Sequence, residues 1–444
     1  MIVTAELSAG VNGGTAPIVV IGAGIIGACS ALRLAREGRR VLLVDRLEPG
    51  SACSFGNAGA LSPSAMVPMA LPGMLGKVPQ WLSDPLGPLA VRWSYLPQAL
   101  PWLLRWIAES RQERVEVASA ALAALNRDTI DGYRELLSPA QFADLVRMTG
   151  HLYVYRAKPE STGDRLAQAL RDRHGIRSRW LDAREVHELE PRLSDAYTSG
   201  MLLPDNGYAV NPQRLVRTLV DNFVEAGGQL LRDEVARLVP LSGGRVTVVT
   251  RTASFEAASV VLAGGAWSNE LLRPLGCAVP LETERGYHVM LERPSFAPNL
   301  PMMIADRKFF LTPMEHGLRI AGTVEIGGLK AAPNWKRANA LFTQAKEVFP
   351  GLTAHGSSTW MGMRPSMPDS VPMIGRLDRA PGIMLAFGHG HLGMSGGPGT
   401  SRLISDLVLG TTPFVDPRPY RADRFRFNRQ AQTAATLEAE RIGR

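Results

Sequence analysis

The stretch from residue 18 to residue 45 constrains the fold more than any other part of the chain. An apolar, β-branched run over residues 18–21 leads into a glycine turn, a helical segment follows, and a second apolar run stops at Asp45. Strand, glycine turn, helix, strand and acid, in this order and spacing, are typical of a dinucleotide-binding βαβ unit. The sequence therefore predicts that the turn binds phosphates at the helix N-terminus and that Asp45 binds a ribose. The turn consists of Gly22, Ala23, Gly24, Ile25, Ile26 and Gly27.

Length and cysteine content predict two domains, or one large composite domain, in a reducing compartment. The chain has 444 residues and three cysteines, Cys29, Cys53 and Cys277, whose wide separation suggests neither a metal site nor a disulfide framework. We expect Cys29, in the first helix, to be a small buried hydrophobic residue. The first seventeen residues lack an early basic region and a long apolar core, so we expect no signal peptide, no membrane-spanning helix and a cytoplasmic protein.

The formal net charge of +8 comes from arginines that are scattered along the chain. They form no basic repeat interleaved with aromatic residues, so we expect a solvated basic surface and no nucleic-acid partner. A weak preference for anionic substrates or acidic lipid surfaces stays open.

The loop after Asp45 distinguishes between nicotinamide and flavin cofactors. A nicotinamide dehydrogenase would repeat the βα pattern here, whereas residues 54–59 form a loop rich in glycine and serine. With this loop the sequence resembles the glycine oxidase and D-amino-acid oxidase family of FAD proteins, and within it the bacterial D-amino-acid dehydrogenase branch, whose Ser-x-x-Asn-x-Gly loop crosses near the flavin. An ordinary glycine-rich surface loop is the alternative. The resemblance assigns cofactor contacts in this region to Arg46, Ser54, Asn57, Ala58, Gly59 and Leu61.

Two later segments extend the resemblance along the chain. Residues 259–268 read as an apolar strand that runs into small residues, like the second FAD contact of the family, and residues 383–410 read as a strand, a glycine- and histidine-rich turn and a helix. The resemblance places the N-terminus of that helix under the flavin, where its dipole would stabilise reduced flavin. Residues 211–239 read as a helix that ends at Gly-Gly and is followed by a strand, and the resemblance implies that this strand contacts the adenine. The residues implied are Val235, Gly264, Trp267, Gly388, His391, Leu392, Gly393 and Met394.

The resemblance implies an α/β fold. We expect a Rossmann-like FAD-binding domain of the glutathione-reductase type and an α+β substrate domain roofed by a mixed or antiparallel sheet. The FAD-binding domain would be discontinuous, formed by residues 16–65, 206–282 and 357–425. The substrate domain would comprise residues 66–205 and 283–356, with 426–444 as a C-terminal tail. The cofactor would be noncovalent FAD, because no cysteine follows Cys277, and we expect no metal.

Candidate substrate-binding residues lie near the last flavin segment and in the expected roof. Arg364 occupies the place of the carboxylate-binding arginine of the family, since guanidinium groups bind carboxylates through two hydrogen bonds. Arg285 and Tyr287 lie in a roof strand, and only one of Tyr287 and His288 can face the pocket if that strand is regular. His389 is a further catalytic candidate, although a turn or core histidine is the alternative. Tyr208 is expected to pack in a loop.

The resemblance implies oxidative deamination of a D-amino acid, with hydride transfer from Cα to flavin N5, an imine and then an oxo acid. The loop 54–66 lacks the aromatic residue or histidine common in the family and has Ala60, Leu61 and Ser62 instead. This departure favours a cyclic imino acid of the D-proline or hydroxyproline type. The alternatives are a glycine, sarcosine or opine oxidase that releases hydrogen peroxide, and a non-catalytic flavoprotein subunit of a hetero-oligomer.

Residues 66–108 contain four of the eight tryptophans and are broken by prolines into short apolar segments. One interpretation is a wall packed on the substrate pocket. The other is a membrane-surface patch that passes electrons to a quinone of the respiratory chain, which would place the protein peripherally on the inner face of the cytoplasmic membrane. The oligomeric state is left open.

Overall fold

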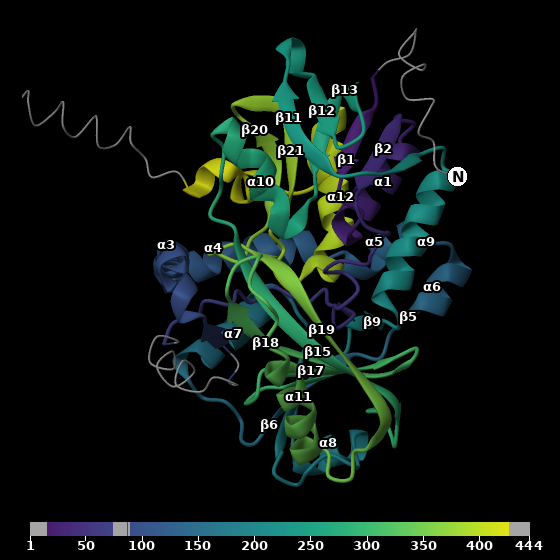
Figure 1. Ribbon diagram of the computed structural model, residues 1–444. Coiled ribbons are helices and arrows are strands. Elements are labelled where there is room, and N and C mark those ends of the chain that lie inside the picture. The colour runs from purple at the N-terminus through teal and green to yellow at the C-terminus, as the bar shows by residue number, and fades with distance from the viewer. Residues whose placement is uncertain (1–15, 74–86, 88, 426–444) are drawn as a thin grey trace, which may run out of the picture.

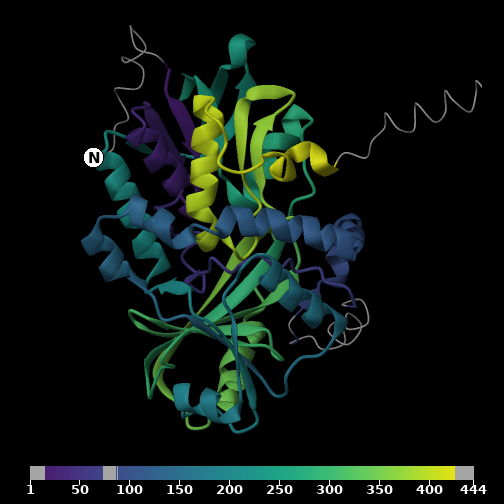
Figure 2. The ribbon, with the colours of Figure 1, turned by 180° about the vertical axis from the view of Figure 1, so that it is seen from behind.

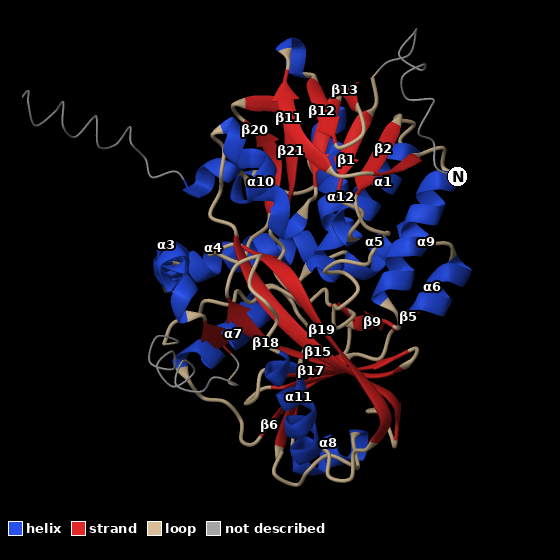
Figure 3. Cartoon of the chain, in the orientation of Figure 1, coloured by secondary structure: helices blue, strands red, loops and turns tan. Residues whose placement is uncertain are grey.

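The computed structural model describes residues 16–73, 87 and 89–425. The chain forms two halves, an upper one around a six-stranded sheet and a lower one around a nine-stranded sheet (Figure 1). Helices flank the upper sheet, and the long strands of the lower sheet rise toward the centre of the molecule (Figure 3). This is the expected α/β architecture with a separate roof sheet.

The six-stranded sheet confirms the predicted βαβ unit. Ile18 pairs in parallel with Val41 and with Ser259, so strands distant in sequence lie side by side. The sheet has a parallel core that is buried on both faces, which explains its uniformly apolar strands. β20 runs antiparallel to β21 at one edge. The strand order is β10 (Gln229–Arg232), β2 (Val41–Asp45), β1 (Ile18–Ile21), β14 (Ser259–Leu262), β21 (Ala380–Phe387) and β20 (Met373–Leu377).

Alternate side chains of β1 pack into two different cores, one on each face of the sheet. Val20 belongs to a cluster with helices, and Val19 belongs to a cluster with a small antiparallel sheet. The helices on the first face are α1 (Ile25–Arg36), α9 (Pro212–Glu225) and α12 (Gly393–Leu409). The sheet on the second face consists of β11 (Val235–Pro240), β12 (Val246–Thr250) and β13 (Ser254–Ala257).

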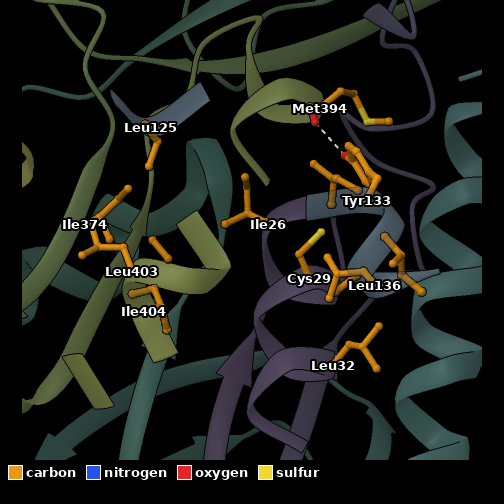
Figure 4. Packing of buried hydrophobic residues seen from close by; sticks show 14 of the residues in the cluster. Ile26, Cys29, Leu32, Leu125, Tyr133, Leu136, Ile374, Met394, Leu403 and Ile404 are labelled. Carbon is orange, nitrogen blue, oxygen red and sulfur yellow. Dashed lines mark hydrogen bonds between the residues drawn. The ribbon is translucent and has the colours of Figure 1, made fainter. Parts of the chain in front are cut away.

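Helix α1 packs closely against α12, which is the helix of the predicted flavin segment at residues 383–410. Cys29 is fully buried there, and a Cβ atom on Gly397 would lie 3.3 Å from its Sγ. Burial raises the pKa of the Cys29 thiol to about 12, so it is a hydrophobic core residue, as predicted. Tyr133 of α5 (Thr129–Leu136) donates a 2.6 Å hydrogen bond to the backbone oxygen of Met394 (Figure 4).

The roof is a mixed sheet, as the resemblance implied. β16 and β6 are parallel to each other, as are β18 and β4, and the other neighbours are antiparallel. The order is β19 (Ala354–Ser366), β15 (Glu282–Pro294), β18 (Gly317–Ile326), β17 (Phe309–Met314), β16 (Met302–Ile304), β6 (His151–Tyr155), β8 (Ser199–Leu203) and β7 (Arg179–Leu181), with β4 (Leu89–Val91) on β18. Helix α11 (Trp335–Val348) packs on the outer face.

Helices from the first inserted segment lie across the back of the molecule, between the two halves (Figure 2). α4 and α5 pack against α12 of the upper half, although residues 66–205 were expected to belong to the substrate domain. In the described ranges no helix is long and apolar enough to cross a membrane. Helix α4 spans Gln112–Asn126, and the other helices of this region are α3 (Leu96–Ala108), α6 (Pro139–Leu145), α7 (Thr162–Arg173) and α8 (Ala183–Leu189). A small separate sheet consists of β3 (Ala60–Leu61), β9 (Gly207–Ala209) and β5 (Val146–Arg147).

Candidate active site

A cleft of about 290 Å³ opens at the carboxyl ends of β1, β2 and β14, where the glycine turn begins. Gly22 has φ +107°, and a Cβ atom there would lie 2.4 Å from the oxygen of Ala263. A Cβ atom on Gly27 would lie 1.7 Å from the oxygen of Gly22. Both positions therefore require glycine, the first for the turn and the second for the approach of helix to strand.

The acid at the end of β2 faces the same cleft. Asp45 accepts a 2.6 Å hydrogen bond from the Ala23 amide and a 2.8 Å bond from the Leu47 amide. Burial raises the pKa of Asp45, while these backbone hydrogen bonds act to lower it. The guanidinium of the next residue, Arg46, lies 5.0 Å from the centroid of the Trp267 ring, which also lines the cleft.

The serine- and glycine-rich loop closes one end of the cleft. Ser54 Oγ accepts a 3.0 Å hydrogen bond from the Ile25 amide, so the loop caps α1 from outside the helix. Asn57 accepts from the Gly59 amide at 2.8 Å. Arg319 of β18 donates to the backbone oxygens of Phe55 and Asn57 at 2.8 and 2.7 Å and thereby fixes the loop.

Fourteen of the predicted site residues line this cleft. They are Gly22, Gly24, Ile25, Ile26, Asp45, Arg46, Ser54, Asn57, Val235, Gly264, Trp267, His389, Gly393 and Met394. Asn57 also lines the larger cavity described below, together with the predicted Ala58, His391 and Leu392. Five of the predicted contacts line neither the cleft nor the cavity: Ala23, Gly27, Gly59, Leu61 and Gly388.

A second cavity of about 1,100 Å³ adjoins the cleft and lies beneath β15, β18 and β19. The Arg364 guanidinium reaches across the neighbouring strand, because a Cβ atom on Gly286 would lie 2.2 Å from Arg364 Cζ. Arg364 Nη1 donates a 3.1 Å hydrogen bond to the Thr323 oxygen. Thr323 has φ +57°, a strained conformation for a β-branched residue, and it lies at a bulge between β15 and β18.

The roof strand β15 presents alternate residues to opposite faces. Arg285 is fully buried, with Nη1 3.1 Å from Glu325 Oε2, and Tyr287 donates its hydroxyl proton to the same carboxylate. The Tyr287 ring also packs edge-on against Trp335 of α11, although part of the residue borders the cavity. These contacts favour a structural role for Arg285 and Tyr287. His288 points to the other face and stacks on Trp360 at a 5.2 Å centroid distance.

The two histidines of the last flavin segment have different surroundings. His389 is buried and lies 2.7 Å from the Thr400 hydroxyl through Nε2, and burial lowers its pKa to about 3. His391 borders the larger cavity instead. Tyr208, in β9, is buried and pairs with Ala60, in agreement with a packing role.

A sequence model of the family described as "FAD dependent oxidoreductase" matches residues 17–407, which is most of the chain. The chain belongs to this family of FAD-dependent oxidoreductases. The protein is therefore a flavoenzyme that uses FAD, as the sequence motifs indicated.

Relatives of this oxidoreductase cover nearly its whole length. A D-amino-acid oxidase of Bradyrhizobium diazoefficiens is 41% identical over 416 residues, which are 92% of this chain and 98% of the relative. A D-amino acid dehydrogenase of Paramagnetospirillum magneticum is 31% identical, with the same shares covered. L-proline dehydrogenase from P. horikoshii has a similar fold, with a TM-score of 0.72 at 19% identity over 93% of this chain and 98% of that chain.

The cleft of this oxidoreductase fits FAD. Its floor lacks side chains at Gly22 and Gly24, and no atom lies within 4 Å of the place of a Cβ atom on Gly265. The N-terminus of α1 lies in the cleft, where the helix dipole would stabilise a pyrophosphate. Asp45 and the Arg46–Trp267 pair are placed to hold the ribose and adenine side.

Sequence reasoning missed Glu284 and Trp360, which both line the cavity. Glu284 lies in phase with Gly286 on the face that Arg364 covers, so the period of two along β15 was the available signal. The Trp360 ring occupies the space above Gly56 and Gly362, where Cβ atoms would lie 1.8 and 1.9 Å from it. Only the folded chain brings Gly56 to this strand.

Proposed function

We propose that this oxidoreductase oxidises a D-amino acid or a D-proline-type cyclic imino acid at the cavity beneath β15, β18 and β19. The observation that carries the proposal is Arg364, which lines this cavity beside the FAD cleft and is held across Gly286 by the Thr323 oxygen. A guanidinium in this position suits a substrate carboxylate. The D configuration rests on the names of the relatives, D-amino-acid oxidase and D-amino acid dehydrogenase.

The residues of the chain orient the substrate and shield it from water. Arg364 holds the substrate carboxylate. The Trp360 ring and the Met66 side chain border the space for the rest of the substrate, and the roof sheet excludes solvent from above. Bound FAD supplies the acceptor for the two electrons and the hydrogen that leave the substrate Cα. Orientation and desolvation are the contributions expected of the protein.

The electron acceptor is either oxygen or a quinone, since relatives include both an oxidase and dehydrogenases. One structural observation favours a membrane-bound acceptor. Trp93 is 77% exposed, and Leu100 and Leu104 are exposed one turn apart on α3, whose Trp102 and Trp106 pack inward. We propose that this outer face of α3 rests on a lipid surface. Trp81, from the same predicted segment, lies outside the described residues.

An anaerobic flavin spectrum tests the function. The purified protein is mixed in turn with D- and L-amino acids, proline isomers, sarcosine and glycine. We expect D-amino acids or D-proline-type compounds to bleach the flavin band, and readmitted air then distinguishes an oxidase from a dehydrogenase. A bound flavin that no amine bleaches would contradict the proposal.

The variant Arg364→Ala tests the assigned carboxylate site. We expect kcat/KM to fall about 100-fold or more with FAD retained, because a bidentate charged contact is lost. Arg364→Lys should recover only part of the lost kcat/KM, since an ammonium group lacks the planar, two-pronged geometry of guanidinium. Arg237→Ala, an exposed arginine on β11, is the control. Unchanged turnover in Arg364→Ala would contradict the assignment of Arg364 to the substrate carboxylate.

A further inference from the structure

Glu284 is a buried carboxylate in the wall of the substrate cavity. Only 4% of the surface of Glu284 is exposed to solvent, and the residue lines the substrate cavity rather than the FAD cleft. Oε2 makes no hydrogen bond with any residue that the structure describes. A buried acceptor left without a partner is costly, so this oxygen favours the approach of a further donor, either the nearby Ser366 hydroxyl or a bound ligand.

Its neighbours place Glu284 next to the carboxylate site. Glu284 and Arg364 are directly paired across β15 and β19, and cross-strand Cβ atoms of such pairs lie about 4.5–5.5 Å apart. An amino acid carries its carboxylate and its amino group on one carbon, so a cation site and an anion site at this spacing match both groups at once. Arg285, the next residue, points to the opposite face and is neutralised by Glu325.

The charges around Glu284 favour a group that can exchange a proton. Burial raises the pKa of Glu284, whereas the charge of Arg364 and the Ser366 hydroxyl act to lower it, and the charge of Glu282 raises it further. Glu282 itself is engaged by the Tyr95 hydroxyl at 3.2 Å. His391 faces the same cavity, and its surroundings lower its pKa to about 4, so it adds no positive charge near neutral pH.

We propose that Glu284 binds the substrate ammonium group and accepts one proton from it, which leaves a neutral amine. This inference rests on the proposed function. An O–H bond forms at the Glu284 carboxylate as one N–H bond of the ammonium breaks, so a pair of opposite charges becomes a neutral acid and a neutral amine. The nitrogen lone pair released in this step is the one that a C=N bond requires when Cα gives up its hydrogen. Arg364 and Glu284 together thus select an α-amino or α-imino acid.

The variant Glu284→Gln tests the proposal because it keeps the shape and removes the proton acceptor. We expect kcat/KM near neutral pH to fall about 100-fold, in the range for general acid–base groups. The loss should shrink as the pH approaches the pKa of the substrate ammonium, since free amine then reaches the site from solution. Glu256→Gln, an exposed carboxylate on β13 that lines neither the cavity nor the FAD cleft, should keep the wild-type pH profile.

Ligand binding, measured by perturbation of the flavin spectrum, provides a readout without turnover. The matched ligand pairs are D-proline with cyclopentanecarboxylate and D-alanine with propionate. In Glu284→Gln we expect weaker binding of the amine member and equal or tighter binding of the amine-free member, because a negative charge beside Arg364 is gone. Equal loss of both members would make Glu284 a structural partner of Arg364 and overturn the proposal, as would binding and a pH profile like those of the wild type.

The two proposals can fail separately. If no amine bleaches wild-type flavin, the proposed function fails, while the ligand pairs still report whether Glu284 recognises an ammonium group. If amines bleach wild-type flavin and Glu284→Gln behaves like the wild type, only the inference about Glu284 fails. A wild-type protein that binds neither member of either pair overturns both.

Discussion

At the scale of single residues, missing side chains shape the FAD cleft as much as present ones do. Gly22 and Gly27 contact backbone atoms across the turn, and their importance could be predicted from the glycine spacing alone. The orientation of Tyr287 could not be predicted, because the bulge opposite it decides how β18 meets β15. Glu284 was hidden for another reason. Glu282 and Arg285 nearby are charged as well, and only the cross-strand pairing distinguishes Glu284 from them.

The variant Gly27→Ala should lose FAD. Its Cβ atom would lie 1.7 Å from the Gly22 oxygen, so the turn and α1 must separate, at a cost of about 1–3 kcal/mol in the free energy of unfolding. The flavin absorbance of the purified protein and a urea titration measure the two effects. Gly38→Ala is the matched control, since it has φ +73° but no atom within 4 Å, and it should cost about 1 kcal/mol and retain FAD. A yellow Gly27→Ala protein would contradict the assigned turn.

At the scale of elements, the sequence predicted the individual strands and helices of the cofactor-binding segments, whereas it predicted the roof sheet only in outline. The predicted strand at 259–268 is β14, and the predicted strand and helix at 383–410 are β21 and α12. Each of these strands is an apolar run followed by glycines, which is a local signal. The roof includes β6, β7 and β8 from a distant part of the chain. Pairing between strands so far apart depends on tertiary packing, which no local pattern records.

Helix α3 yields a prediction about lipid binding. The double variant Leu100→Glu/Leu104→Glu places two carboxylates on the exposed apolar face and should abolish co-sedimentation with phosphatidylglycerol vesicles. Flavin bleaching by the substrate should persist, because neither leucine lines the cavity. The control is Val117→Glu on α4, which is 63% exposed and should bind vesicles like the wild type. If the wild type does not sediment with vesicles, the apolar face of α3 does not bind lipid.

At the scale of the whole molecule, buried histidines in both halves make the stability depend on pH. His151 in β6, His288 in β15 and His389 after β21 have pKa values lowered by burial to about 4, 3 and 3. Below the ordinary value of 6.5, the unfolded chain takes up protons that the folded chain does not. Stability is therefore present above pH 6.5 and lost as the pH falls toward the folded values. Glu190, whose pKa burial raises to about 7, acts in the opposite direction.

Urea unfolding of His389→Gln at pH 7 and pH 5 tests this dependence. At pH 7 the variant should be about 1 kcal/mol less stable, because the contact with Thr400 is weakened. At pH 5 the difference should shrink or reverse by roughly 1–2 kcal/mol, since the variant no longer has a buried imidazole that resists protonation. His316→Gln, with an exposed side chain, should keep the wild-type slope. Parallel curves for His389→Gln and the wild type would contradict the assignment.

The long roof strands also determine how the molecule can move. β15 and β19 have 13 residues each and are paired along almost their whole length, and Ser366 at the end of β19 bridges to His389 beside the FAD cleft. Hinges are formed by a few loop or terminal residues, whereas these two strands are hydrogen-bonded to each other over their length, so we expect the two halves to keep their relative positions when a substrate binds. The exposed Arg156, Glu160 and Lys308 line part of the substrate cavity. A substrate that enters the cavity past these three residues would meet their charges before it reaches the flavin.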